Sequence, residues 1–199
     1  MAQKIITNNK RIACLGISAN PPHLGHLAAA RQILKNAAID EVWFVPCYKH
    51  AFAKHLIPWQ HRLKMIKMME GPGIKVCDIE KENGFSYTIK TLRKLKKQYP
   101  EYQFFWAVGS DIILSNEYKK WKKWKELSRL IKFYVVQRPG YQLEKDSIPE
   151  CFELLPKIPF LTKDISSTLI RERLKRGLNI KNLVSLKVEK YIFKNKLYI

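Results

Sequence analysis

The chain has 199 residues, 46% of them hydrophobic, which suffices to bury the core of one globular domain. Its formal net charge of +20 invites a nucleic-acid-binding hypothesis, although the lysines are spread along the whole chain, as a genome-wide lysine bias would spread them. The sequence contains no run of 18 apolar residues, so no membrane span is predicted. Residues 1–10 lack the apolar segment of a secretory signal.

Four cysteines, Cys14, Cys47, Cys77 and Cys151, are scattered without any CxxC spacing. The first three lie in or beside predicted strands, which favours buried reduced thiols over a disulfide framework. Reduced thiols are typical of a reducing compartment, so we expect a cytoplasmic protein. Because no zinc-ligand spacing occurs, we predict no metal held by the protein's own side chains.

Strands and helices alternate along the chain. Short apolar runs bounded by Pro or Gly predict strands, and apolar residues three and four positions apart predict helices. In chain order we expect a strand at 11–15, a helix at 27–35, a strand at 41–46, a loop at 47–57, a helix at 58–70, a strand at 74–79, a loop at 80–87, a helix at 88–99, a strand at 102–108, short helices within 112–127, a strand at 130–136, a loop at 141–150, and helices at 166–176 and 183–194. Residues 151–161 fit a strand or irregular structure equally.

This alternation predicts an α/β fold with a doubly wound parallel sheet. We expect a single domain over 1–199, with a sheet-containing core at about 10–164 and a small helical part at 165–199. Ligands of such sheets bind beyond the carboxyl ends of the strands. Several polar segments follow predicted strand ends and should therefore meet at one site: 16–26, 47–55, 109–111 and Arg138.

The turn after the first strand, GISANPPHLGH, carries two histidines. Gly16 at its start lets the backbone approach a ligand closely. His23 and His26 flank Gly25 at the start of the next helix, where backbone amides and the helix dipole favour an anion. The turn therefore suits phosphate oxygens, although two ordinary surface histidines in a loop would give the same four-residue pattern.

This turn resembles the signature of the HxGH nucleotidyltransferases, and more narrowly that of the nicotinate/nicotinamide mononucleotide adenylyltransferases, G-G-S/T-F-x-P-x-H-x-G-H. It departs at Ile17, where Gly is usual, and at Ala19, where Phe is usual. Both departures affect how the backbone at 17–19 meets the nucleotide. The resemblance implies a Rossmann-like nucleotidyltransferase fold, with ATP-binding residues at Gly16, Ile17, Ser18 and Gly25.

A second string, ISSTLIR, runs from Ile165 to Arg171. Ser166 or Ser167 is a natural N-cap, and the backbone amides at the start of this helix are then available to a phosphate. Arg171 can donate two hydrogen bonds to phosphate oxygens. A capped helix with a surface arginine would look the same locally. The string resembles the family's I-S-S-T-x-I-R without departure, and two signatures about 140 residues apart in the right order identify the superfamily. The resemblance implies that Ile165, Ser166 and Ser167 bind ATP.

Further strings resemble the family's mononucleotide site. FSYTIKTL resembles S-Y-T-x-x-T-L, which implies that Tyr87 and Thr88 hold the carboxylate or amide of the pyridine. Trp121 and Trp124 match W-x-x-W. The resemblance implies that one tryptophan stacks on the pyridine ring while the other packs in the core, and we favour Trp121 for stacking.

Three more residues complete the expected site. The string Gly109-Ser110-Asp111 resembles G-A/S-D, which implies that Gly109 binds ATP and that Asp111 binds the ribose and phosphate regions. Arg138 matches R-P-G and would meet the mononucleotide phosphate. The loop YKHAFAK departs from the P-P-H-K form of bacterial relatives and resembles a branch that reads H-A-F-G-K before P-x-x-x-R. Lys54 in this loop is our expected phosphate contact, with a solvated lysine as the alternative.

The resemblance implies adenylyl transfer from ATP to nicotinate mononucleotide, with His23, His26 and Arg171 as the catalytic residues and Mg²⁺ carried on the ATP phosphates. Nicotinate is favoured over nicotinamide mononucleotide because a carboxylate needs hydrogen-bond donors only, which threonine, serine and backbone amides supply. We expect no specific nucleic acid and no membrane as partners. A homo-oligomer is compatible with the sequence.

Three alternatives remain. Pantetheine-phosphate adenylyltransferases share both signatures, but they are typically shorter and lack the Tyr-Thr string and the tryptophan pair. A fragment of a class I aminoacyl-tRNA synthetase would suit the basic charge, but no KMSKS lysine pattern accompanies 165–171. A basic nucleic-acid-binding protein would explain the charge, yet no helix-turn-helix, zinc or RNP pattern is present.

Overall fold

The structure is a computed structural model that describes residues 9–50, 55–81, 84–144, 148–156 and 165–199. Six strands form one sheet in which every neighbouring pair is parallel, which confirms the predicted sheet type. Their order in space is β4 (Ile74–Val76), β2 (Glu41–Pro46), β1 (Arg11–Ile17), β6 (Gln103–Gly109), β7 (Phe133–Val136) and β8 (Phe152–Leu154).

The first strand, β1, lies at the centre of the sheet, and later strands are added on both sides of it. The chain first lays β2 and β4 on one side of β1, and then returns to lay β6, β7 and β8 on the other side. The direction of winding therefore switches between β1 and β6, and a doubly wound sheet opens its ligand crevice at this point, beyond the carboxyl ends of the strands.

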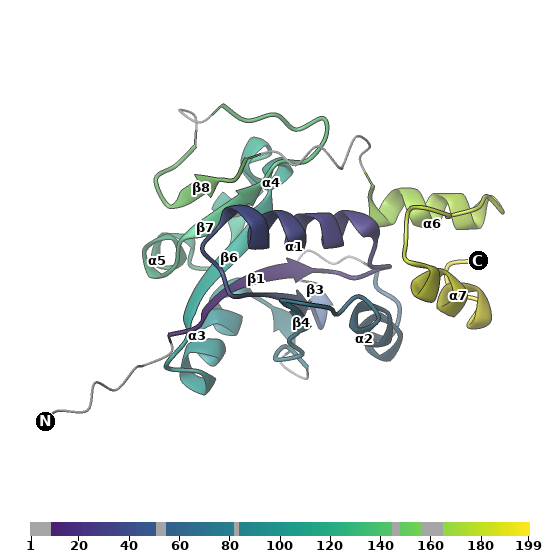
Figure 1. Ribbon diagram of the computed structural model, residues 1–199, viewed down its shortest axis with the longest axis horizontal. Coiled ribbons are helices and arrows are strands. Elements are labelled where there is room, and N and C mark those ends of the chain that lie inside the picture. The colour runs from purple at the N-terminus through teal and green to yellow at the C-terminus, as the bar shows by residue number, and fades with distance from the viewer. Residues whose placement is uncertain (1–8, 51–54, 82–83, 145–147, 157–164) are drawn as a thin grey trace, which may run out of the picture.

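Alternating residues of β1 face opposite helical layers. Ala13 and Leu15 belong to a core shared with α1, α2, α6 and α7, whereas Ile12 and Cys14 belong to a core shared with α3, α4 and α5. Figure 1 shows α1 crossing the sheet and α6 and α7 grouped at one end of it. The helices are α1 (Leu24–Asn36), α2 (Trp59–Lys67), α3 (Thr88–Gln98), α4 (Ser110–Leu114), the 3-10 turn η1 (Glu117–Lys120), α5 (Trp124–Leu130), α6 (Ser167–Lys175) and α7 (Leu186–Lys194).

The structure departs from the expected elements at the sheet edges. The strand expected at 74–79 ends at Val76, and the strand expected at 130–136 begins at Phe133 because α5 continues through Leu130. The ambiguous segment after 150 forms β8, which pairs with β7. Two segments expected as loops contribute a short parallel ladder, β3 (Lys49–His50) with β5 (Phe85–Ser86).

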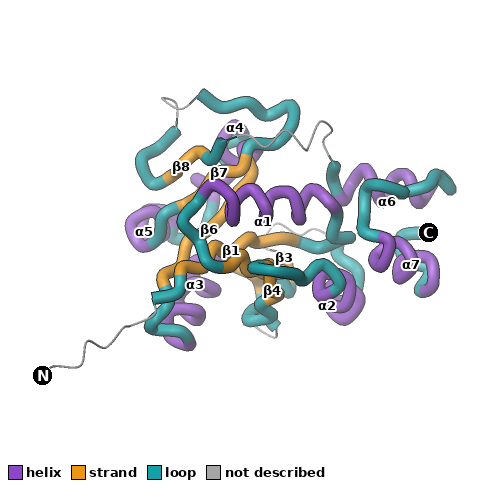
Figure 2. The backbone as a smooth tube through the Cα atoms, viewed as in Figure 1, coloured by secondary structure: helices purple, strands orange, loops and turns teal. Residues whose placement is uncertain are grey.

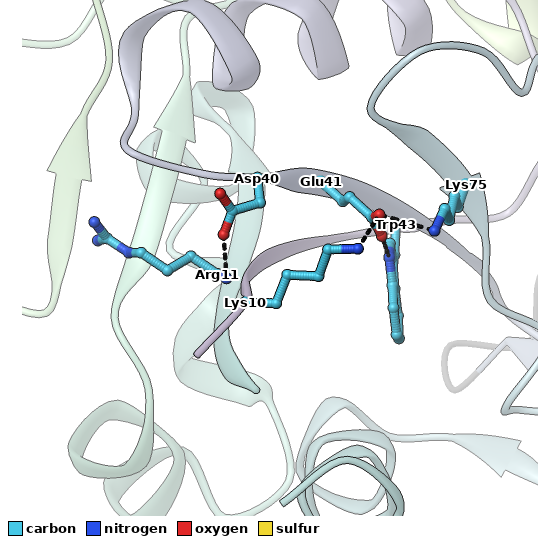
Figure 3. A network of polar contacts seen from close by, with 6 residues as sticks. All are labelled: Lys10, Arg11, Asp40, Glu41, Trp43 and Lys75. Carbon is cyan, nitrogen blue, oxygen red and sulfur yellow. Dashed lines mark hydrogen bonds and ion pairs between the residues drawn. The ribbon is translucent and has the colours of Figure 1, made fainter. Parts of the chain in front are cut away.

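A buried glutamate of β2 bonds to β4 and to the residue before β1, at the end of the sheet opposite the crevice. Figure 3 shows Lys10, Lys75 and the Trp43 indole converging on Glu41, at 2.5, 2.8 and 2.8 Å respectively. Burial would raise the pKa of Glu41, but the hydrogen bonds from these three residues outweigh it and lower the pKa to about 2. The ionised carboxylate therefore stabilises the folded state.

The C-terminal helices attach to the turn that follows β1. The backbone amide of Leu24 donates to the carbonyl of Leu183 at 2.9 Å, and the Tyr198 hydroxyl donates to Asn20 Oδ1 at 3.0 Å. Figure 2 shows α7 lying beside α2 at this end of the molecule.

The four cysteines are free, as expected, although only Cys14 is fully buried and the other three are half-buried. Among the helices of the described residues, none has the length and apolar character needed to cross a membrane.

Candidate active site

A cavity of about 1230 Å³ opens at the switch point, beyond the carboxyl ends of β1 and β6. Lys54, the expected phosphate contact, lies outside the described residues. Every other predicted site residue lines this cavity: Gly16, Ile17, Ser18, His23, Gly25, His26, Tyr87, Thr88, Gly109, Asp111, Trp121, Arg138, Ile165, Ser166, Ser167 and Arg171.

The two histidines pack face to face at the start of α1. Their ring centroids are 3.7 Å apart with an interplanar angle of 27°. His26 Nδ1 accepts a hydrogen bond from the backbone amide of His23 at 3.1 Å. A neutral imidazole has one acceptor and one donor nitrogen, so His26 carries its proton on Nε2, and this N–H is available as a donor in the cavity.

Both imidazoles are neutral at pH 7. Burial lowers the pKa of His26 to about 3, and the nearby Arg138 cation acts in the same direction. Burial also lowers the pKa of His23 well below its usual value, with His26 and Arg138 as further causes. Within the described part of the chain, nothing hydrogen-bonds His23 Nδ1, and this buried atom lies against Gly25.

Gly25 is required by the packing of the His23 ring. A Cβ at this position would lie 2.9 Å from His23 Nδ1, 3.0 Å from its Cε1 and 3.3 Å from the carbonyl oxygen of Ile165. Gly16 has a similar reason, because its Cβ would lie 2.8 Å from Cζ2 of the Trp106 indole. The sequence predicts that Gly16 lets the backbone approach a ligand closely. The structure adds a second reason for glycine here, because a side chain would clash with Trp106.

The first backbone amides of α1 were expected to be available to an anion, but two of them are hydrogen-bonded within the protein. The Leu24 amide is taken by the Leu183 carbonyl, and the His26 amide bonds the His23 carbonyl at 3.0 Å. These two amides are therefore not left for an anion.

The two residues that depart from the family pattern are buried, although Ile17 also contributes to the cavity wall. Ile17 packs in the core that faces α1. Ala19 is fully buried with φ of 52°, a left-handed backbone that L residues other than Asn and Asp rarely adopt. A small side chain at this buried position fits the space that the surrounding core leaves.

The second signature bonds directly to the first. Arg171 Nη1 donates to the carbonyl of Asn20 at 2.8 Å, and Ser167 Oγ donates to the carbonyl of Pro21 at 2.8 Å. Ser166 is the N-cap of α6, with its Oγ accepting from the Leu169 amide at 3.1 Å. These bonds hold a guanidinium and a helix N-terminus against the histidine turn.

An arginine and an aspartate pair on the β6 side of the cavity. Arg138 Nη1 lies 2.8 Å from Asp111 Oδ2, and the Arg138 amide donates to Ser110 Oγ at 3.0 Å. A Cβ at Gly109 would overlap Asp111 Oδ1, so glycine is needed for the carboxylate to sit here. The pair places one cation and one anion beside the ends of β6 and β7.

The far end of the cavity is aromatic. Trp121 is half-buried and lines it, whereas Trp124 packs against Tyr118, Phe133 and Phe152 in the core. Tyr87, the N-cap of α3, lines the same end. Both tryptophans are half-buried and contact Phe133, so the stacking role expected for Trp121 stays a prediction.

Arg62 is buried and is not among the described residues that line the cavity, but it bonds to the cavity residues Ser18 and Cys47. Its guanidinium donates to four backbone carbonyls, those of Ser18 at 2.9 Å, Cys47 at 2.7 Å, Tyr48 at 2.9 Å and Ile57 at 3.0 Å. It therefore clamps together the loops that follow β1 and β2. The P-x-x-x-R spacing was the available signal.

Two further polar residues support the cavity wall without any signal in the sequence. Asn20 donates to the carbonyl of His55 at 3.1 Å and accepts from the Ile57 amide and the Tyr198 hydroxyl. Glu80 is buried and accepts from Thr91 Oγ1 at 2.6 Å. Burial raises the pKa of Glu80, and hydrogen bonds from Ser86 and Thr91 oppose that effect.

No group of three His, Cys, Asp or Glu side chains suited to a metal ion occurs among the residues that the structure describes. Two of the carboxylates in the cavity wall are engaged, Asp111 by Arg138 and Glu80 by Thr91.

Sequence comparisons match this chain over most of its length. Residues 15–173 match the family described as "Cytidylyltransferase-like". A "Probable nicotinate-nucleotide adenylyltransferase" of Shouchella clausii is 39% identical, covering 95% of this chain and 97% of that protein. The "Nicotinate-nucleotide adenylyltransferase" of Bacillus subtilis is 38% identical, covering 95% and 98% respectively.

The fold matches solved structures of similar proteins. The Plasmodium falciparum nicotinic acid mononucleotide adenylyltransferase complexed with NaAD superposes with a TM-score of 0.81 at 25% identity, covering 95% of this chain and 97% of that one. The same Plasmodium protein complexed with APC gives a TM-score of 0.78 at the same identity and coverage.

Proposed function

Because this chain belongs to the nicotinate-nucleotide adenylyltransferases, within the cytidylyltransferase-like family, we propose that its cavity binds ATP and the mononucleotide side by side. The enzyme transfers the adenylyl group of ATP to nicotinate mononucleotide and releases pyrophosphate, a step in NAD biosynthesis. The triphosphate lies between α1 and α6. The pyridine ring lies at the aromatic end, near Tyr87 and Trp121.

The observation that carries this assignment is the contact between the two signatures. The bonds from Arg171 and Ser167 to the carbonyls of Asn20 and Pro21 join segments about 150 residues apart. They bring the guanidinium, the α6 N-terminus and both imidazoles to one wall of the cavity. Three kinds of anion-binding group on one wall suit a triphosphate.

The chemistry is an in-line displacement at phosphorus. An oxygen of the mononucleotide 5′-phosphate forms a bond to the α-phosphorus of ATP, the bond from that phosphorus to the β-phosphate oxygen breaks, and pyrophosphate leaves with the electron pair. The attacking oxygen is already anionic, so neither a general base nor a covalent enzyme intermediate is required. Catalysis then consists of positioning and charge stabilisation.

Each side chain has a distinct part in that task. His26 Nε2–H and the His23 imidazole donate to α- and β-phosphate oxygens as negative charge moves onto the leaving group. Arg171 and the α6 amides near Ser166 hold the β- and γ-phosphates. When the mononucleotide binds, Arg138 exchanges its bond to Asp111 for one to the mononucleotide phosphate. Asp111 then accepts hydrogen bonds from the ribose hydroxyls.

Mg²⁺ enters with ATP as part of the substrate. It is bound by phosphate oxygens and water, as is usual for Mg²⁺ in phosphoryl-transfer sites. On the triphosphate, the ion neutralises negative charge.

Cytoplasmic residence and a one-domain organisation complete the proposal. Four free thiols support a reducing compartment. Core residues of α6 and α7 pack together with those of β1, α1 and α2, which supports one domain over 1–199.

The test is an assay of the purified protein with ATP, Mg²⁺ and nicotinate mononucleotide. Dinucleotide and pyrophosphate should appear in equal amounts, and His26→Ala and Arg171→Ala should each reduce the rate while the fold is retained. Turnover of phosphopantetheine, with none of either pyridine mononucleotide, would contradict the proposed function.

A further inference from the structure

Lys122 stands in the cavity wall beside the aromatic end. It follows Trp121 in the chain, and its Nζ lies 4.7 Å from the centre of the Tyr87 ring. All three side chains line the cavity. The adenylyl transfer described above has no use for this ammonium, because the reacting phosphates are held by other residues.

The turn that carries Lys122 is fixed against α3. The Trp124 amide donates to the Trp121 carbonyl at 3.1 Å, and Lys123 adopts φ of 56° to reverse the chain between η1 and α5. Glu126 of α5 pairs with Lys123 and with Arg93 of α3. Lys122 is therefore presented to the first turn of α3, where Tyr87 and Thr88 lie.

The acid and amide mononucleotides differ in charge at this end. Each has a positively charged pyridinium ring, but only nicotinate adds a carboxylate, which makes its substituted ring neutral overall. An ammonium near the ring attracts the carboxylate and repels a pyridinium that lacks one. Donors such as the Thr88 hydroxyl can bond either substituent, so they discriminate less.

We propose that Lys122 selects nicotinate over nicotinamide mononucleotide by pairing with the carboxylate on the bound pyridine ring. This inference rests on the proposed function, since it places the ring between Trp121 and Tyr87. Lys90 adds a second ammonium, 5.5 Å from the centre of the Tyr87 ring. Glu80, Asp111 and Glu117 are the acidic residues among the described residues that line the cavity, and Asp111 is paired with Arg138.

The experiment measures kcat/KM for both mononucleotides at saturating ATP. Lys122→Met removes the charge and keeps a long unbranched side chain, while Lys122→Arg keeps the charge. Lys125→Met is the matched control, because it removes the same charge from the same segment and Lys125 is not among the described residues that line the cavity.

For Lys122→Met we expect kcat/KM for nicotinate mononucleotide to fall about tenfold, mainly through KM, which corresponds to about 1.4 kcal/mol. The value for the amide should stay level or rise, so the acid-to-amide ratio falls at least about tenfold. Lys122→Arg should keep most of the preference, and Lys125→Met should shift the ratio less than about twofold. The loss should shrink at high salt, as expected for a partly exposed ion pair.

Two results would overturn the inference while leaving the proposed function intact. An unchanged ratio in Lys122→Met would mean that the ammonium does not meet the carboxylate. An equal loss for both mononucleotides would assign Lys122 to a part that they share, such as the phosphate. Failure of the wild-type protein to turn over either mononucleotide would instead overturn the proposed function, and this inference with it.

Discussion

Gly25→Ala should reduce turnover while leaving stability almost unchanged. Gly25 lies in the first turn of α1, and alanine favours a helix over glycine by about 1 kcal/mol. Against that gain, the new Cβ would lie 2.9 Å from His23 Nδ1. The ring must move by roughly 0.5–1 Å to restore ordinary contact, and it is confined by His26 at 3.7 Å between centroids.

A displacement of this size at a catalytic group can cost about 100-fold in rate, so we expect kcat to fall about 10- to 100-fold. The opposing stability effects should leave the melting temperature within a few degrees of the wild type. Pyrophosphate release gives kcat, and thermal unfolding followed by circular dichroism gives the melting temperature. Gly71→Ala is the control, because a Cβ there meets nothing within 4 Å; both of its values should match the wild type.

A double-mutant cycle identifies the route of the effect. If Gly25→Ala acts through the His23 ring, adding it to His23→Ala should cause little further loss. Full kcat in Gly25→Ala, or an undiminished loss when the imidazole is already gone, would show that the added Cβ does not act by displacing the His23 ring.

Three further predictions follow from the same structure. His26→Ala should lower kcat about 100- to 1000-fold with the melting temperature retained, and Arg171→Ala should mainly raise the KM for ATP; unchanged kinetics in either variant would remove that residue from the mechanism. The folded-state pKa of Glu41, about 2, lies below its ordinary 4.5, so its contribution to stability is complete above about pH 4.5 and disappears as the pH falls toward 2. Glu41→Gln should therefore flatten the dependence of melting temperature on pH in this window, and a curve parallel to the wild type would show that the network contributes nothing. Any affinity for DNA or RNA should be independent of sequence and fade by roughly 200 mM salt in filter binding, since it would rest on phosphate contacts; sequence-dependent binding at that salt would require a second function.

The centre of the sheet could be predicted from sequence because it is buried on both faces. The apolar runs that form β1, β2 and β6 are visible without any knowledge of their neighbours. The edges could not be predicted so well, since β4 and β8 have three residues each and are defined by pairing with one neighbour. The β3–β5 ladder joins segments about 35 residues apart, and nothing local marks it.

In the site too, residues marked by a local sequence pattern could be predicted, and residues that act through distant contacts could not. Residues within the two signatures were predictable, because their strings resemble a known family and their places follow from the strand ends. Arg62 and Glu80 were not assigned a part in the site, because each acts through contacts with distant segments. Arg62 serves four carbonyls on loops after β1 and β2, and nothing in a nine-residue helix reveals those acceptors.

The charge of the site is local and does not depend on the +20 of the whole chain. Arg138 and Arg171 supply positive charge, and each is oriented by a bond to the fold, to Asp111 and to the Asn20 carbonyl respectively. The two imidazoles add directed hydrogen-bond donors without adding charge, because burial and Arg138 keep the pKa of both well below neutrality. A protonated imidazole here would repel the arginine before substrate arrived. Because the pKa of each histidine lies well below its ordinary value, neither is expected to change turnover by gaining a proton near neutral pH.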